Sequence, residues 1–213
     1  MLEIFLKDVE YIYSPKTHYE KRIKLEGELK VESGKVVLIT GKNGSGKTTI
    51  LQIAAVLLKP TSGSIMINGE NPWKNPWDYR RKIGFSFQFP EDQFFETRVF
   101  DEVVFAPKNY NLDDLEERYK RSLETVGLDP DEYKDKIPFL LSGGEKRKVA
   151  IASIISHDPE ILILDEPLVG LDIPSRKEIL NILSKWKEQG KGMLISTHKI
   201  NIFSGISDEI IYI

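Results

Sequence analysis

The chain has 213 residues, 40% of them hydrophobic and 30% charged, a size that fits one domain or one domain with an inserted lobe. It contains no cysteine, which excludes a disulfide framework and a thiolate metal site, and its formal net charge of −3 leaves no general basic field for nucleic acid. No apolar run approaches the roughly 18 residues that span a bilayer, and the amino terminus lacks the features of a signal peptide. We therefore expect a soluble protein that reaches a membrane only through a partner.

In the first half of the chain, apolar runs bounded by glycine and proline predict strands and one helix. In chain order these are edge strands in 2–12, a buried strand over 36–39, a helix over 49–58, a strand over 63–69 ending in an Asn-Gly turn, a loop over 71–77 and a strand over 82–89. Phe85, Phe87 and Phe89 would share one face of the last strand, because successive side chains of a strand point to opposite faces.

The chain then becomes helical and charged. Apolar residues recur every three or four positions over 111–127, which predicts a helix with Asn111 as its N-cap. Later elements are a buried helix over 145–156, a buried strand over 161–164, a helix opened by Pro174 and closed by Gly190, and strands over 193–196 and 210–213. Strands alternating with helices predict an α/β fold with a mainly parallel sheet.

Residues 41–48 read GKNGSGKT and fit the pattern GxxxxGK[ST]. The glycines let backbone N–H groups converge on phosphate oxygens, and the following helix adds positive potential. Lys47 would contact the β- and γ-phosphates, and Thr48 would be a ligand of Mg²⁺. The predicted ATP-binding residues here are Gly41, Lys42, Asn43, Gly44, Ser45, Gly46, Lys47, Thr48 and Thr49. A plain glycine-rich turn is the alternative, but the position between a buried strand and a helix favours nucleotide binding.

Two carboxylates, Asp165 and Glu166, end the buried strand. We expect Asp165 to hold the Mg²⁺ shell and Glu166 to polarise the attacking water as general base. Adjacent acids at a strand end are otherwise common as solvated turn charges. The phosphate loop in the same chain favours the catalytic interpretation.

A third motif, LSGGE at 141–145, precedes a helix that Ser142 can cap. A helix N-terminus with a hydroxyl beside it is a second phosphate site. One chain cannot easily bring both sites onto one ATP, whereas two chains arranged head to tail can. Ser142, Gly143, Gly144 and Glu145 are therefore predicted to bind ATP in trans, with an ordinary helix cap as the alternative.

In this order the motifs resemble the nucleotide-binding subunit of ATP-binding-cassette (ABC) proteins over the whole chain. The resemblance implies a P-loop NTPase (RecA-like) core with an N-terminal antiparallel β subdomain, about 1–91 and 156–213. It also implies an inserted α-helical signature lobe, about 92–155.

The same resemblance assigns roles to four further residues. Gln88 would touch Mg²⁺ and the attacking water, and His198 would contact the γ-phosphate. Asp172 would lie in the loop that crosses the dimer interface. Tyr13 would stack on adenine, with Tyr11 as the second candidate. His18 and His157 match no motif, and we expect them to be solvated.

Residues 88–95, 101–109 and 141–152 narrow the match, because they look like the ATPase of energy-coupling-factor uptake systems for vitamins, cobalt or nickel. Beside Gln88, four phenylalanines would form an apolar groove for a helix of a transmembrane subunit, or would pack in the core of the lobe. We expect some in each role: Phe89, Phe94, Phe95 and Phe105. The partner contact is thus expected between Gln88 and Phe105.

The hypothesis is an ATP-hydrolysing transporter subunit, cytoplasmic and peripheral on the inner face of the cell membrane. It would use ATP and Mg²⁺, bind no nucleic acid, and form a homodimer or a heterodimer with a paralogous ATPase. One alternative is a soluble DNA-repair or chromosome-maintenance ATPase. The mildly acidic charge and the short span of about 95 residues between Lys47 and Ser142, without heptads, disfavour it. A nucleotide sensor that does not turn over is disfavoured by Glu166.

Overall fold

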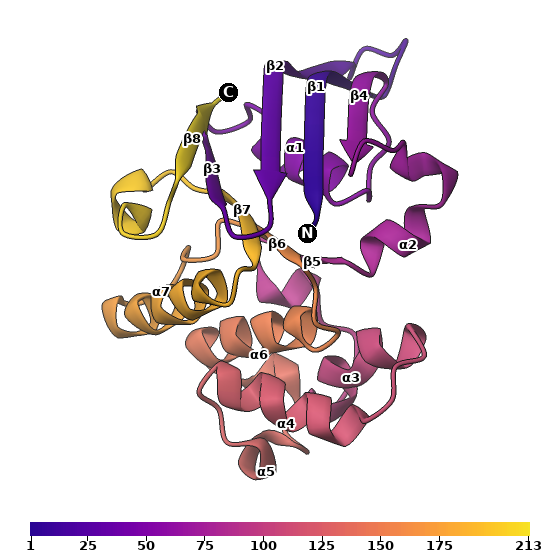
Figure 1. Ribbon diagram of the computed structural model, residues 1–213. Helices are drawn as coiled ribbons and strands as arrows, with labels where there is room; N and C mark the ends of the chain where they lie inside the picture. The colour runs from indigo at the N-terminus through magenta and orange to yellow at the C-terminus, as the bar shows by residue number, and fades with distance from the viewer.

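Two sheets and a group of helices lie one below the other in the computed structural model, which describes residues 1–213 (Figure 1). The smaller sheet is antiparallel with strand order β2-β1-β4, and the larger is parallel with order β5-β6-β7-β3-β8. The strands are β1 (Glu3–Tyr13), β2 (Lys21–Glu32), β3 (Val36–Thr40), β4 (Ser62–Ile67), β5 (Ile83–Ser86), β6 (Ile161–Asp165), β7 (Gly192–Ser196) and β8 (Glu209–Tyr212). This architecture confirms the predicted α/β fold with a mainly parallel sheet.

The helices α3 to α6 gather below the parallel sheet, and α7 lies beside α6 on the left of the view (Figure 1). The α-helices are α1 (Lys47–Ala54), α2 (Pro76–Arg80), α3 (Val99–Asn109), α4 (Leu115–Thr125), α5 (Pro130–Tyr133), α6 (Gly143–Ile155) and α7 (Ile173–Glu188). Short 3-10 helices cover Pro72–Lys74, Pro90–Asp92, Pro138–Leu140 and Ile200–Phe203. None of the helices combines the length and the apolar character needed to cross a lipid bilayer.

The parallel sheet separates two hydrophobic cores, because its strands bury both faces. In β3, Val36 and Leu38 pack toward the helices, while Val37 and Ile39 pack toward the antiparallel sheet and α1. β6 and β7 show the same alternation. The continuous apolar runs read from the sequence therefore correspond to strands buried on both sides.

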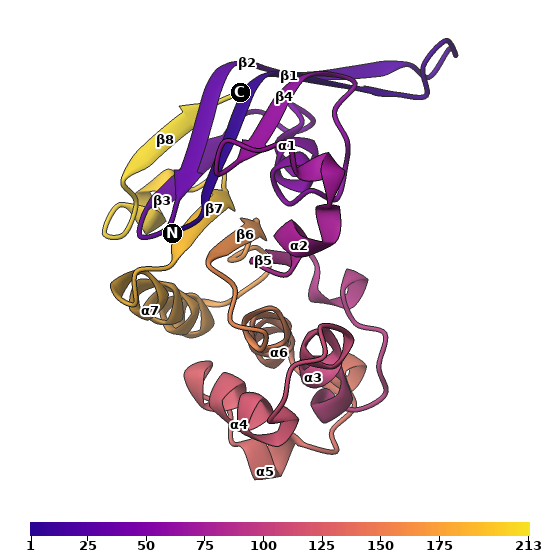
Figure 2. The same cartoon turned by 45° about the vertical axis from the view of Figure 1, so that its right-hand side comes forward.

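The strand predicted near the amino terminus is present, but its expected place at a sheet edge was wrong. β1 pairs with β2 on one side and with β4 on the other, so it is the central strand of the antiparallel sheet. Its partner β2 was not predicted, although the buried residues Ile23, Leu25, Leu29 and Val31 alternate with polar ones in the sequence. Figure 2 shows the β1–β2 hairpin extending beyond the body of the molecule.

Three predicted boundaries differ from the structure. The strand expected over 82–89 ends at Ser86, because the carbonyl groups of Phe87 and Gln88 accept hydrogen bonds from Arg147 instead of continuing the ladder. The helix expected from residue 111 begins at Leu115, since Asn111 and Asp114 both adopt positive φ values of 52° and 60°. Asn111 is therefore not its N-cap. The helix expected over 49–58 spans Lys47–Ala54.

The segment expected to be a loop over 71–77 contains two helical turns. The Asn71 side chain accepts a hydrogen bond from the backbone N–H of Trp73 at 3.0 Å, and Pro72 and Pro76 open the two turns. Proline at the first helical position has a suitable φ and loses no hydrogen bond there. The Asn68-Gly69 turn after β4 is as predicted, with φ values of 51° and 77°.

Candidate functional site

Four loops of the parallel sheet meet at its carboxyl edge, where ligands bind in open α/β sheets. The phosphate loop follows β3, Gln88 follows β5, Asp165 and Glu166 end β6, and His198 follows β7. Together they line a cleft of about 650 Å³. The predicted residues in its lining are Tyr13, Asn43, Gly44, Gly46, Lys47, Thr48, Thr49, Gln88, Asp165, Glu166 and His198, while Gly41, Lys42 and Ser45 lie outside it.

The phosphate loop leaves the N-terminus of α1 without a side-chain cap. Its N-cap, Gly46, has a φ of 106°, and a Cβ there would lie 2.1 Å from Cγ2 of Ile23, so only glycine fits. The Lys47 ammonium donates to the carbonyl oxygens of Gly41 and Lys42 at 3.1 and 3.2 Å. A helix N-terminus with free N–H groups and an ammonium beside it is suited to bind phosphate.

The acid pair is held in one orientation by Ser196. The Ser196 hydroxyl is fully buried, donates to Asp165 and accepts from the backbone N–H of Glu166 at 2.9 Å. Glu166 has a φ of 45°, a strained value for a residue with a side chain, and such strain concentrates at functional sites. The sequence interpretation of 196–198 concerned His198 and missed this role of Ser196.

The Glu166 carboxylate faces the cleft from a largely buried position, with 7% of the residue exposed. Its Oε1 lies 3.3 Å from Nε2 of His198. Burial raises the pKa of Glu166, while His198 and Lys47 oppose that shift. A carboxylate with a raised pKa beside an imidazole is suited to accept a proton from water.

The oxygen atoms near Asp165 fit a Mg²⁺ ion that is completed by phosphate and water. The Thr48 hydroxyl donates to Oδ2 of Asp165 at 2.5 Å, so the two predicted ligands face each other. No group of three or more His, Cys, Asp or Glu residues forms a cage for a metal ion. Mg²⁺ needs no such cage, because it prefers one or two protein oxygens together with substrate phosphates.

The end of β1 and the start of β2 form the outer wall of the cleft. The Tyr13 hydroxyl is 2.9 Å from that of Thr49, and the Tyr13 ring meets Tyr11 edge-on at 4.7 Å. Stacking of Tyr13 on adenine stays a prediction. Lys21 and Ile23 also line the cleft, and the sequence interpretation missed them because β2 carries no motif.

The LSGGE motif lies outside this cleft and is exposed at Ser142 and Gly143. The Ser142 oxygen accepts from the backbone N–H of Glu145, and the Glu145 carboxylate accepts from that of Ser142 at 2.8 Å, which is a capping box. Hydrogen bonds from Ser142 and Tyr133 lower the pKa of Glu145 to about 2. The cap therefore forms even without phosphate.

Asp172 lies on the same surface as the motif. It caps α7, accepting from the backbone N–H of Ser175 at 2.9 Å, and the Ser175 hydroxyl would be only 2.8 Å from a Cβ on Gly144. The residues predicted to act in trans are thus neighbours of one another, and the structure does not bring them to the ATP cleft of their own chain.

Arg147 connects α6 to the loop of Gln88, a link that the sequence interpretation did not identify. Only 1% of Arg147 is exposed, and its guanidinium donates to the carbonyl oxygens of Phe87, at 3.0 Å, and of Gln88. Gln93 makes a second link, donating to Ala150 at 2.9 Å. These contacts tie the helix behind LSGGE to the loop that enters the cleft.

The phenylalanines near Gln88 divide between core and surface. Phe94 is buried with 6% exposed, whereas Phe89, Phe95 and Phe105 are 53%, 55% and 40% exposed. Phe95 and Phe105 meet edge-on at 4.3 Å and line an apolar cavity of about 230 Å³, here called the aromatic groove. Phe89 does not line this groove.

His157 also lines the aromatic groove, so its predicted solvation was wrong. Both of its ring nitrogens are buried, and burial lowers the pKa of His157 to about 4. The imidazole packs edge-on against Tyr110 at 5.3 Å. His18, by contrast, is exposed as expected.

Residues 26–169 match the sequence profile of the ABC transporter family. The chain is 47% identical over 211 residues to the energy-coupling factor transporter ATP-binding protein EcfA2 of Thermotoga maritima, covering 99% of this chain and 79% of that one. It is 40% identical to EcfA2 of Clostridium perfringens, covering 99% and 76% of the two chains.

Two solved structures have a similar fold. The dimeric structure of MJ0796, a bacterial ABC transporter cassette, matches with a TM-score of 0.85 at 30% identity, covering 99% of this chain and 94% of that one. The structure of cbiO1 from Clostridium perfringens, part of the ABC transporter complex cbiONQ, matches with a TM-score of 0.80 at 33% identity, covering 98% and 83%.

Proposed function

The chain belongs to the ABC transporter family of ATP-binding proteins, and from that premise we propose that it powers an energy-coupling-factor uptake transporter by closing a dimer around ATP. It is an ATPase that converts ATP and water to ADP and phosphate. The observation that carries the proposal is the separation of two half-sites. The phosphate loop, Asp165, Glu166 and His198 meet in one cleft, while Ser142 is exposed on another surface of the same chain.

Within the cleft, the residues have distinct tasks. Lys47 and the free N–H groups at the start of α1 bind the triphosphate. Glu166 accepts the proton of the attacking water, and His198 orients the carboxylate from 3.3 Å. Thr48, Gln88 and Asp165 would hold Mg²⁺, which when bound offsets negative charge on the phosphates.

Closure requires a second copy of the chain or a paralogous ATPase. The Ser142 hydroxyl and the N–H groups of Gly143 and Gly144 would approach the γ-phosphate held by the partner, with Glu145 and Asp172 at the same seam. Their exposure and their mutual proximity support this assignment. Contacts made only in the closed dimer shift the equilibrium toward closure.

The aromatic groove is the surface through which we propose that the ATPase meets a helix of the transmembrane subunit. Phe95 and Phe105 would contact the helix, and exposed apolar surface of this kind marks an interaction site. The Gln88–Phe105 segment would then report occupancy of the groove to the cleft. The chain would lie on the inner face of the membrane, with 92–155 forming the signature lobe on a core of 1–91 and 156–213.

The Glu166→Gln variant tests the proposal. Loss of the general base should slow hydrolysis by about 10²–10⁴, while nucleotide binding remains. The variant should therefore elute as a dimer from gel filtration with ATP and Mg²⁺, and as a monomer without ATP. Glu188→Gln, an exposed change at the far end of α7, is the matched control and should hydrolyse normally. Only monomer in the presence of ATP and Mg²⁺ would count against the shared site.

A further inference from the structure

A second cavity of about 270 Å³ adjoins the ATP cleft on the other side of Glu166 and His198. Glu166, Val169 and His198 line both cavities, so these side chains form the wall between them. We call this second cavity the rear pocket; its remaining walls come from the loop after β6, from the start of α7 and from the segment after β7. A small molecule that passes between Glu166 and His198 would enter it directly.

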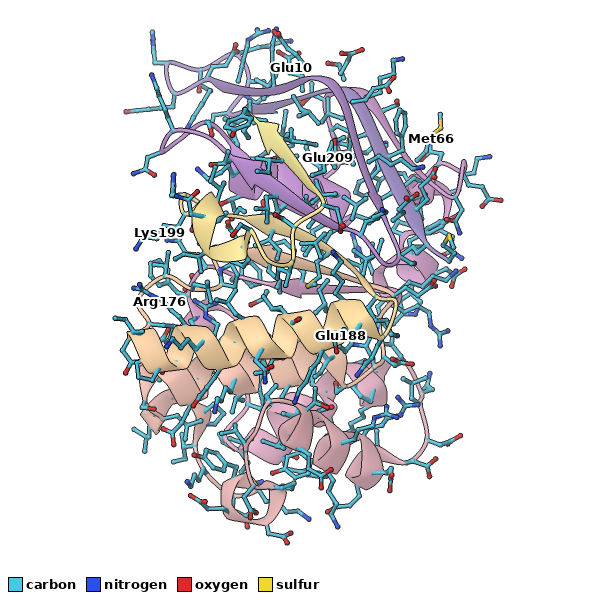
Figure 3. The ribbon with its side chains drawn as sticks, turned by 60° about the vertical axis from the view of Figure 1, so that its left-hand side comes forward. Glu10, Met66, Arg176, Glu188, Lys199 and Glu209 are labelled. Atoms are coloured by element: carbon cyan, nitrogen blue, oxygen red, sulfur yellow. The ribbon has the colours of Figure 1, made fainter.

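The charge in the rear pocket is positive. Arg176 and Lys199 line it, and neither side chain forms a salt bridge or a hydrogen bond, although Asp172 lies close enough to Arg176 to feel its charge. Nε of Arg176 is buried without a partner. The only carboxylate in the lining is Glu166, which faces both cavities. Figure 3 places Arg176 and Lys199 on the same edge of the molecule, one on α7 and the other beside the short helix after β7.

We propose that the rear pocket receives the inorganic phosphate released by hydrolysis, an inference that rests on the proposed function of the cleft. Phosphate is a small anion, and a guanidinium offers it two parallel donors while an ammonium adds charge. Cleavage leaves phosphate next to Glu166, which has just accepted the proton of the attacking water and is therefore neutral. The cations Arg176 and Lys199 behind Glu166 then attract the phosphate anion.

The wall opens when His198 leaves Glu166. The two side chains are 3.3 Å apart, and His198 is exposed, so it can turn outward without breaking the core. ADP stays on the phosphate loop, because its β-phosphate is held by Lys47 and the α1 N-terminus. Phosphate can thus leave from the rear while ADP still occupies the front.

Phosphate inhibition of ATP hydrolysis tests the rear pocket. Phosphate that rebinds to the ADP-bound protein should inhibit noncompetitively toward ATP, and substitutions in the rear pocket show whether it binds there. Arg176→Gln and Lys199→Gln should each raise the inhibition constant of phosphate about tenfold, the loss expected for one charged contact. The KM for ATP should stay unchanged. Lys177→Gln, an exposed neighbour outside the pocket, is the control and should behave as wild type. Unchanged inhibition in both Arg176→Gln and Lys199→Gln, or an equal effect of Lys177→Gln, would overturn the assignment.

Direct titration of inorganic phosphate into the ADP-bound protein, followed by calorimetry, separates this inference from the proposed function. If the wild-type protein fails to hydrolyse ATP, the proposed function falls, but the titration still reports on the pocket. Binding that weakens about tenfold in Arg176→Gln and not in Lys177→Gln supports the rear pocket. Equal binding by wild type and Arg176→Gln contradicts it, even in an active enzyme.

Discussion

Replacement of Arg147 by methionine should show whether Arg147 only stabilises the fold or also positions the Gln88 loop for hydrolysis. Arg147 donates two hydrogen bonds to backbone carbonyls, and a hydrogen bond from a charged group contributes about 1.5–3 kcal/mol, so the pair contributes about 3–6 kcal/mol. Burial opposes this, since it lowers the pKa of Arg147 well below its usual value, to about 10, a shift equivalent to about 3 kcal/mol. Methionine fills similar volume without a buried charge.

The difference leaves a net loss of about 0–3 kcal/mol for Arg147→Met, or a fall in Tm of at most about 12 °C for a chain of this size. Hydrolysis should fall further, by about tenfold, because the Gln88 loop is no longer held while the phosphate loop is untouched. The assay is thermal unfolding beside steady-state hydrolysis and equilibrium ATP binding. We expect ATP affinity to stay at the wild-type value.

Two matched variants sharpen the test. Lys146→Met removes only the partly exposed pair with Glu91 and should change stability by less than about 1 kcal/mol. Arg147→Lys keeps a buried charge but can reach fewer carbonyls, so it should be no more stable than Arg147→Met. An Arg147→Met variant with lowered Tm and an unaltered hydrolysis rate would refute the positioning role.

Three further variants test the cleft and its distant half-site. Lys47→Ala should abolish ATP binding in an equilibrium titration without unfolding the chain, and unchanged affinity would contradict the phosphate-loop assignment. Ser142→Gly should lower the stability of the fold by only a few tenths of a kcal/mol, because glycine is tolerated as an N-cap. Combined with Glu166→Gln, it should nevertheless abolish the ATP-held dimer. A dimer that survives in the double variant would argue against contact in trans. Glu145 has a pKa lowered to about 2, so its stabilisation is full above about pH 4.5 and is lost as the pH falls toward 2. The Tm difference between wild type and Glu145→Gln should therefore shrink over that range, and a constant difference would show that the Glu145 charge is not involved.

Short-range signals made much of the fold and cleft predictable. The runs at β3, β6 and β7 are continuously apolar because both faces of these strands are buried. In 41–48, Gly44 and Gly46 adopt positive φ values, which are a local requirement of the backbone. The capping box at Ser142 is equally local. Each of these elements is specified within a few residues, which is the range over which a pattern can be read.

The missed features depend on contacts between distant residues. β1 is central only because β4, some 60 residues later, pairs with its free side. Arg147 reaches carbonyls 59 and 60 positions earlier, which no local pattern encodes. His157 lacks a motif, and its burial comes from the packing of Tyr110 and the neighbouring β5. Pairing and packing over such separations appear only in three dimensions.

The alternation of β3, β6 and β7 between two cores also limits which parts of the site can move during the reaction. If one of these strands slipped by one residue, each of its side chains would move from one hydrophobic core to the other. The two cores differ in shape, so neither can accommodate such a shift. Glu166 and His198 closely follow two such strands, β6 and β7. Their backbone spacing is thus set at folding and persists through every turnover, leaving side-chain rotation and approach of a second molecule as the variables of the cycle.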